Sequence, residues 1–334
     1  MDRIDPPPEQ ELREIGARLH EAARGARPSL FNPGGMRGRL LAAAMRDDTL
    51  RSALFQFVDV LPSLDSAQAI AAHFRAYLHG HRLGGVWGRL LALGELPWAA
   101  WAVRRSVQRL ARQFLVEETP DALRGVIESL ARIPAAVTVD AVGEAVLSEE
   151  EADACLARNL ALLRWLTQTG ARPPNFSLKP SALTSRFDPL DPEGTARRVL
   201  ARLAPLLEEA AECGAALTLD MENHELKPLI LDLFRQIAQS RPEAGWLPGI
   251  ALQAYCPETE RDLYALLQWA RERGRRIGVR LVKGAYWDTE VATAAARHWP
   301  CPVYREKSAT DAAYERLTRL LFQHVEIVRP AIAS

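Results

Sequence analysis

The feature that most constrains the fold is an alternation of short apolar runs and amphipathic helical stretches that begins after Pro134. One helical stretch, 195–213, ends at Gly214, and another, 258–273, ends at Gly274, where glycine is the usual left-handed stop. Repeated strand–helix units with uniformly apolar strands predict a buried parallel sheet covered by helices. The five predicted strands are Ala135–Val142, Asn175–Leu183, Ala215–Asp220, Gly249–Ala254 and Ile277–Lys283.

Two architectures contain such a sheet. A doubly wound sheet normally has a glycine-rich phosphate loop after its first strand, and neither GxGxxG nor GxxxxGK[ST] occurs in this chain. We therefore expect an α/β fold of the (β/α)8 barrel type, with site residues at the carboxyl ends of the strands. Residues 1–134 instead have apolar residues at three- and four-residue spacing, which predicts a helical N-terminal region. The chain is thus expected to divide near residue 134, with the barrel in 135–334.

Composition excludes several classes of protein. The 42 basic and 42 acidic side chains give a formal net charge of zero, which argues against nucleic-acid binding. The four cysteines include no CxxC pair, so neither a disulfide framework nor a zinc knuckle is predicted. His73, His79 and His81 have no acidic or cysteine partner at ligand spacing, so no metal site is expected. Met1–Leu12 lacks the basic and apolar regions of an export signal, and a cytoplasmic location is expected.

Polar and charged side chains stand at or near the end of each predicted strand. A lone charge in an apolar strand is costly unless it is paired, and the strand ends of a barrel converge on one mouth. We therefore expect a functional site there; the alternative is a set of unrelated residues solvated at the rim. Lys179 is also compatible with a Schiff-base nucleophile. The residues concerned are Asp140, Glu144, Lys179, Asp220, Glu222, Gln253, Arg280 and Lys283.

The segment Arg280–Asp288, RLVKGAYWD, resembles the signature of the flavin-dependent proline dehydrogenase family, as found in the barrel domain of bacterial proline utilization A. Four earlier segments agree with that family in order and spacing. They are VDAVGEA at 139–145, FSLKPSAL at 176–183, LTLDME at 217–222 and LQAY at 252–255. The resemblance covers about residues 102–334, and the region before it resembles the α-domain that precedes these barrels.

This resemblance implies oxidation of L-proline to 1-pyrroline-5-carboxylate by hydride transfer from proline C5 to N5 of FAD, with electrons passing to a membrane quinone. It implies substrate-pocket roles for Lys179, Asp220 and Tyr286, a gating carboxylate at Glu144, and a position beside the flavin for Arg280. These five are the implied catalytic residues. The implied cofactor-binding residues are Asp140, Gln253, Arg280, Lys283, Gly284, Ala285, Trp287, Lys307 and Thr310.

The end of the chain raises a further expectation. A sixth strand begins near Pro330, whereas a complete barrel takes about 250 residues. We expect the last barrel strands to be missing and the isolated chain to be a poor catalyst. Two interpretations stay open. One is a proline dehydrogenase fragment, completed by a separate C-terminal chain or followed by an aldehyde dehydrogenase domain; the other is a non-catalytic remnant that binds a partner.

A tryptophan-rich stretch allows two interpretations. Trp87, Trp98 and Trp101 lie in or beside the apolar segment Leu90–Val103, which Glu95 and Pro97 interrupt. A helix packed on its own protein is the simpler interpretation. The alternative is peripheral contact with the inner membrane, through which the protein would reach its quinone.

Overall fold

The computed structural model describes residues 9–25, 48–78, 104–105, 116, 119–130, 136–141, 145–169, 174–240 and 245–333. The chain forms two compact units, residues 1–117 and 118–334. The described elements of the first unit are all helical, as predicted for this region. They are α1 (Glu9–Gly25), α3 (Asp48–Val60), the 3-10 turn η1 (Leu61–Ser63) and α4 (Ala67–Leu78).

Helices α3 and α4 pack through aromatic and aliphatic side chains. The rings of Phe57 and Phe74 meet edge to face with centroids 5.1 Å apart, and both side chains are buried. Ser66 caps α4 because its Oγ accepts a hydrogen bond from the amide of Ala69 at 3.1 Å. Trp87, the segment Leu90–Val103, His79 and His81 lie outside the described residues. Among the helices that are described, none has the length and apolar character needed to cross a bilayer.

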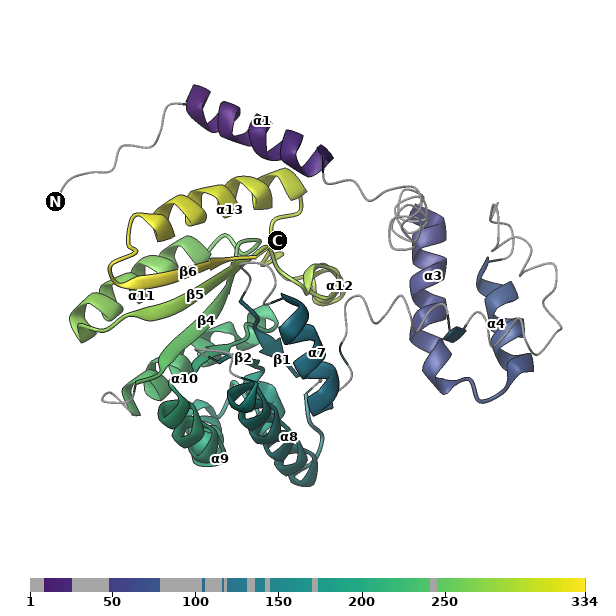
Figure 1. Cartoon of the computed structure of the whole chain (residues 1–334), viewed down its shortest axis with the longest axis horizontal. Helices are drawn as coiled ribbons and strands as arrows, with labels where there is room; N and C mark the ends of the chain where they lie inside the picture. The colour runs from purple at the N-terminus through teal and green to yellow at the C-terminus, as the bar shows by residue number, and fades with distance from the viewer. Residues whose placement is uncertain are drawn as a thin grey trace. The chain divides into compact units, whose positions relative to one another are not determined.

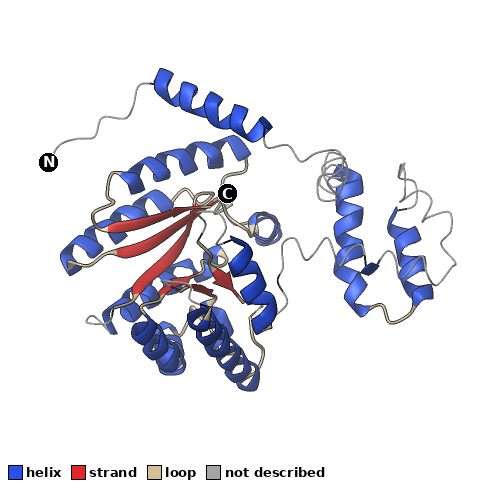
Figure 2. Cartoon of the chain, in the orientation of Figure 1, coloured by secondary structure: helices blue, strands red, loops and turns tan. Residues whose placement is uncertain are grey.

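The second unit is built on a six-stranded parallel sheet in which each strand pairs with the next one along the chain (Figure 1). Figure 2 shows the strands as an inner layer with helices around their outer side. This sequential parallel order, with connecting helices, confirms the expected barrel-like α/β fold. The strands are β1 (Val139–Asp140), β2 (Asn175–Leu178), β3 (Ala216–Leu219), β4 (Leu247–Gln253), β5 (Ile277–Val282) and β6 (Val328–Ile332).

The helices of the second unit connect these strands. They include two short 3-10 turns, η2 (Pro180–Leu183) and η3 (His224–Leu226). The α-helices are α7 (Pro120–Leu130), α8 (Glu149–Gln168), α9 (Pro192–Cys213), α10 (Lys227–Ser240), α11 (Thr259–Arg273), α12 (Trp287–Arg297) and α13 (Lys307–Phe322).

Local sequence signals account for several helix ends. Gly214 after α9 and Gly274 after α11 have φ of +67° and +69°, so both predicted left-handed stops are confirmed. Thr119 Oγ1 accepts a hydrogen bond from the amide of Ala122 at 3.3 Å, at the start of α7. Helix α7 belongs to the second compact unit, so this unit begins before the change of pattern at Pro134.

The core lies between the sheet and its helices. Side chains alternate between the two faces of a strand, and in β5 the buried residues Ile277, Val279 and Leu281 alternate with partly exposed ones. Buried apolar residues of the other strands, such as Phe176 and Ile250, belong to the same hydrophobic cluster. In β5, one face is therefore used for packing, and the other face, which carries Arg280, is partly exposed.

Two predicted strands are shorter in the structure. β2 ends at Leu178, so Lys179 does not lie within a strand as expected but caps the 3-10 turn η2. Pro180 explains this end, because it has no amide hydrogen to continue the ladder. β1 contains only two residues, and residues 142–144, which include Glu144, lie outside the described residues.

Candidate functional site

The carboxyl ends of β2, β3 and β5 bring one acidic and two basic side chains together. Lys179 and Asp220 directly follow β2 and β3, whereas Arg280 lies within β5. The guanidinium of Arg280 donates from Nη2 to Oδ1 of Asp220, and Lys179 Nζ lies 3.7 Å from Oδ2. Ser177 on β2 donates its hydroxyl to Oδ1 of Asp220 at 2.5 Å. We call these four residues the Asp220 cluster.

Asp220 is the centre of this cluster and is only 7% exposed. A buried carboxylate needs compensation, and here it receives two hydrogen bonds and lies near a second cation. Within the cluster, the two cations Lys179 and Arg280 share this one carboxylate, and the carboxyl groups of Asp140 and Glu222 lie within electrostatic range. Arg280 Nε is buried without a hydrogen-bond partner among the described residues. The cluster therefore keeps a donor that no described residue uses.

Two further predicted residues lie within electrostatic range of the cluster. Burial raises the pKa of Asp140, and the carboxylate of Asp220 adds to the increase, while Lys179 and Arg280 oppose it. Burial, followed by the nearby carboxylates of Glu222 and then Asp220, raises the pKa of Tyr286. The phenol of Tyr286 therefore stays protonated at neutral pH and can donate a hydrogen bond.

A second hydrogen-bond network fixes the chain after β3. Glu222 accepts from the backbone amide of Ser181 at 3.1 Å and from its hydroxyl at 2.6 Å. Gln253, at the end of β4, donates from Nε2 to the carbonyls of Met221 at 3.0 Å and Glu222 at 3.1 Å. Burial raises the pKa of Glu222, although both Ser181 hydrogen bonds act against this increase. The network joins three strand ends and holds Asp220 in place.

Small residues occupy the sheet face that carries the cluster. By alternation along the strands, Ala251 shares a face with Gln253, and Gly278 shares a face with Arg280. Ala251 and Arg280 are register partners on neighbouring strands. These short side chains lie beside a guanidinium and a carboxamide on the same face. This arrangement suits a flat polar ring.

The segment after β5 is held by a close backbone approach. Gly284 has φ of +133°, and a Cβ built on it would lie 2.5 Å from ring atoms of Tyr255. No residue with a side chain fits here without displacing that ring. This contact explains why residue 284 is glycine, and it cannot be read from the sequence alone. Trp287, at the start of α12, donates from Nε1 to the carbonyl of Tyr304 at 2.9 Å. Ala285 between them is exposed.

The residues predicted near residue 307 form a separate charged group. Lys283 Nζ lies 2.8 Å from Oδ1 of Asp311, and Lys307 Nζ lies 2.5 Å from Oδ2. We call these three residues the Asp311 cluster. The hydrogen bond from Lys283 lowers the pKa of Asp311, and the same bond raises the pKa of Lys283. Lys283 also lies over the ring of Tyr314, 5.6 Å from its centroid, and Thr310 is buried in the first turn of α13.

The structure thus brings Lys179, Asp220 and Arg280 into one cluster, and Lys283 and Lys307 into another. Asp140 and Tyr286 lie within electrostatic range of the first cluster. Their individual roles stay predictions, and Glu144 lies outside the described residues. Sequence reasoning did not assign Ser177, Ser181, Tyr255 or Asp311. A serine inside the apolar strand β2 was a signal that could have been used, because a buried hydroxyl requires a partner.

The comparisons with known proteins are consistent with this arrangement. The family model described as proline dehydrogenase matches residues 123–334, well over half of the chain. The chain belongs to the proline dehydrogenase family. A second model, the proline utilization A N-terminal domain, matches residues 9–114 of this family member. Both matches confirm the resemblance drawn from the sequence motifs.

Among curated relatives, the bifunctional protein PutA of Salmonella typhimurium is 25% identical over 253 residues, which is 74% of this chain and 19% of PutA. The proline dehydrogenase of Deinococcus radiodurans is 26% identical over 240 residues, which covers 71% of this chain and 68% of that enzyme. The chain therefore spans about a fifth of the length of that PutA relative.

Solved structures agree on the fold. Proline utilization A from Bdellovibrio bacteriovorus, inactivated by N-propargylglycine, matches with a TM-score of 0.82 and 29% identity over 96% of this chain and 34% of that chain. Proline utilization A from Corynebacterium freiburgense matches with a TM-score of 0.61 and 28% identity over 66% of this chain and 23% of that chain.

Proposed function

We propose that this chain takes part in the FAD-dependent oxidation of L-proline to 1-pyrroline-5-carboxylate. The reaction removes a hydride from C5 and a proton from the ring nitrogen, and leaves a C5=N double bond in the product. The single observation that supports this proposal most strongly is the Asp220 cluster over a sheet face of small residues, in a member of the proline dehydrogenase family.

The residues present fit a flavin. When bound, FAD supplies the acceptor for the hydride, and the protein supplies binding, orientation and charge. The unpartnered Nε of Arg280 offers a donor next to the small-residue face, and its charge opposes negative charge that builds up on the acceptor during reduction. Gln253 uses its amide donors on backbone carbonyls and so retains its carbonyl as an acceptor. The other proposed contacts come from Asp140, Lys283, Gly284, Ala285, Trp287, Lys307 and Thr310.

Asp220 orients Arg280 and Lys179 in this proposal. It holds both cations at one place, where their N–H donors suit the carboxylate of proline. Tyr286 offers an apolar ring for the pyrrolidine and a protonated hydroxyl for a polar contact. Glu144 is proposed as the carboxylate that gates the pocket.

The proposal extends to the acceptor and the product. Electrons pass to a quinone in the membrane, so a cytoplasmic protein of this kind makes peripheral contact with the inner membrane. The product carries the carbon skeleton of glutamate semialdehyde in cyclic form. An aldehyde dehydrogenase domain or a separate complementing chain is the proposed partner that acts with this one.

A visible spectrum of the purified chain before and after anaerobic addition of L-proline tests the proposal. We expect flavin bands from bound or added FAD. Because the isolated chain is expected to be a poor catalyst, these bands should be lost only slowly when L-proline is added. Arg280→Met should slow the bleaching of the flavin bands by about 100-fold or more, since it removes a positive charge next to the proposed flavin site. Arg271→Met, on the exposed surface of α11, is the matched control, and its flavin should be reduced at the parent rate.

A flavin-free spectrum that added FAD does not change would contradict the proposal. So would a loaded protein whose flavin bands persist with excess L-proline while dithionite bleaches them. Measuring both the FAD content and the reduction rate separates loss of cofactor binding from loss of chemistry.

A further inference from the structure

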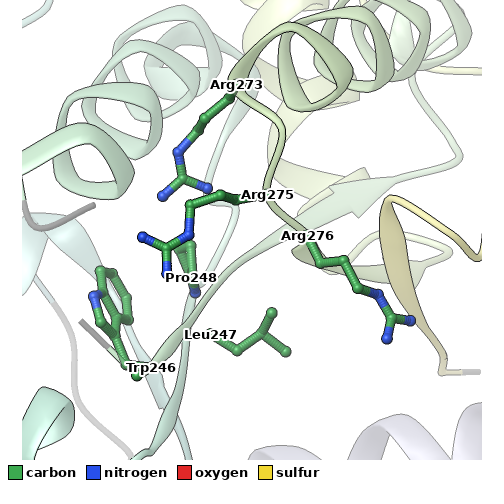
Figure 3. A pocket seen from close by; sticks show the side chains of 7 residues that line it. Trp246, Leu247, Pro248, Arg273, Arg275 and Arg276 are labelled. Atoms are coloured by element: carbon green, nitrogen blue, oxygen red, sulfur yellow. The ribbon is translucent and has the colours of Figure 1, made fainter. Parts of the chain in front are cut away.

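A cavity of about 200 Å3 lies where β4 and β5 begin. The strands of the sheet are parallel, so this edge is opposite the carboxyl ends that carry the Asp220 cluster. Trp246 and Pro248 give it an apolar wall (Figure 3). The remaining lining residues are Gly245, Leu247, Arg273, Arg275 and Arg276.

Three arginines line this cavity, and two of them converge. Figure 3 shows the guanidinium groups of Arg273 and Arg275 near one another on the side of Trp246, while Arg276 turns away from them. Arg276 is anchored elsewhere, because its Nη2 donates to the backbone carbonyls of Val325 at 2.9 Å and Val328 at 3.2 Å. The converging pair therefore forms the electropositive part of the cavity.

The converging pair has donors without partners. Arg273 donates from Nη2 to the carbonyl of Ala238 at 2.6 Å, but its Nη1 is buried and unsatisfied among the described residues. Arg275 makes no hydrogen bond or ion pair with any residue that the structure describes. Burial, with the charge of Arg275 added, lowers the pKa of Arg273. A buried unsatisfied donor beside an unpaired like charge calls for an anion.

The bonds to backbone carbonyls do not explain this arrangement completely. Capping the end of α10 accounts for Nη2 of Arg273 but leaves Nη1 unused. No acidic side chain in the described part of the chain pairs with Arg273, Arg275 or Arg276. The chain as a whole has zero net charge, so three arginines that lack an acidic partner among the described residues are a local excess of positive charge.

We propose that this cavity binds the phosphate group of a small molecule. Two adjacent guanidinium groups provide paired N–H donors that match a phosphate, and a phosphate monoester carries about two negative charges at neutral pH. A single carboxylate would neutralise only one of the two arginines. Trp246 and Pro248 form an apolar surface for the remainder of the molecule. The site lies apart from the proposed proline site and does not depend on it.

Titration calorimetry with the full chain in a low-salt chloride buffer tests the site. Inorganic phosphate and adenosine monophosphate are the two probes, and we expect saturable binding with one site per chain. Arg275→Gln should weaken binding at least about tenfold, because it removes a donor fork that no described residue uses. Arg271→Gln is the matched control: it removes an exposed arginine four residues away that does not line the cavity, and should change the affinity less than about twofold.

The two probes distinguish the source of the phosphate. Tighter binding of adenosine monophosphate would assign the apolar wall to the organic part of the ligand, and equal affinity would assign the site to free phosphate; both support the proposal. No saturable binding of either probe would overturn it, as would equal weakening by Arg275→Gln and Arg271→Gln. Arg273→Lys, which keeps the charge but loses the fork, should also weaken binding while circular dichroism shows a folded protein. None of these readouts requires flavin or proline.

Discussion

The Asp220 and Asp311 clusters have the same charges, one carboxylate between two cations, in different surroundings. Asp220 is buried and has a serine hydroxyl as an additional donor, whereas the side chain of Asp311 is 37% exposed. Water solvates the charges of the exposed cluster, and salt screens them. The side chain of Asp220 is only 10% exposed and is compensated mainly by protein groups, whereas Lys179 and Arg280 are about a quarter exposed. Two clusters with the same ion-pair geometry can therefore contribute differently to the free energy of unfolding, because the contribution depends on how deeply the charges are buried.

The largest expected effect comes from removing the buried carboxylate. Asp220→Asn removes the carboxylate that lies between Arg280 and Lys179, and should lower the free energy of unfolding by about 3 kcal/mol. Urea denaturation monitored by circular dichroism measures this change. Asp311→Asn is the matched control and should unfold at the parent midpoint in moderate salt. Equal shifts for both variants would show that burial does not separate the two clusters.

The backbone provides a second contrast between a crowded and an open position. Gly284→Ala places a Cβ 2.5 Å from the ring of Tyr255 at φ of +133°, and should lower the free energy of unfolding by about 2 kcal/mol or more. Gly125→Ala, in α7 where nothing lies within 4 Å of the added Cβ, should instead raise it by about 0.5–1 kcal/mol. Thermal unfolding of both variants gives the sign of each change. A stable Gly284→Ala protein would mean that the Tyr255 ring moves aside easily.

The fold was predictable because its signals are local and repeated. The parallel sheet and its helices were predicted from three signals. These are the glycine stops after α9 and α11, the apolar strands and the absence of a phosphate loop. The predicted ends of the strands were less accurate, as Lys179 shows. Pro180 stops the hydrogen-bond ladder of the sheet within a run of apolar residues that looks continuous in the sequence. The position of charged residues at strand ends also predicted that Asp220 and Arg280 would meet.

The partners within the site were harder to predict. Ser177 and Ser181 donate to carboxylates more than 40 residues away in sequence, and nothing local in the sequence fixes such pairings. The contact of Gly284 with Tyr255 depends on how the segments after β4 and β5 pack together. The unsatisfied donor of Arg273 likewise becomes visible only when burial is known. Long-range geometry and burial are what the structure adds.

Ser177 tests whether the donor at the centre of the buried cluster matters. Ser177→Ala leaves one acceptor position of the Asp220 carboxylate without its hydroxyl partner, and should lower the free energy of unfolding by about 1 kcal/mol. Ser129→Ala removes an exposed hydroxyl that donates to the carbonyl of Val126, and should have a smaller effect in the same denaturation experiment. A Ser177→Ala protein as stable as Ser129→Ala would assign the compensation of Asp220 to its two cations alone.

The smallest effect concerns pH and compares two glutamates whose pKa values move in opposite directions. Hydrogen bonds from the hydroxyl of Ser185, and then from Arg202, lower the pKa of Glu149 to about 2 from an ordinary 4.5. Its contribution to stability is therefore present above pH 4.5 and is lost as the pH falls toward 2. Burial raises the pKa of Glu222, so its contribution is present below pH 4.5 and is lost as the pH rises through the folded-state value.

Denaturation midpoints measured from pH 3 to pH 8 separate these two contributions. Glu149→Gln should flatten the acid side of the profile. The variant no longer has a carboxylate whose charged form is more stable in the folded state than in the unfolded chain. Glu222→Gln should flatten the neutral side, because an amide at this buried position never has to be desolvated as a charge. Glu150→Gln, an exposed neighbour without a hydrogen bond or ion pair among the described residues, should leave both sides unchanged. If Glu149→Gln and Glu222→Gln changed the same side of the profile, burial and hydrogen bonding would not have the opposite effects that the structure assigns to them.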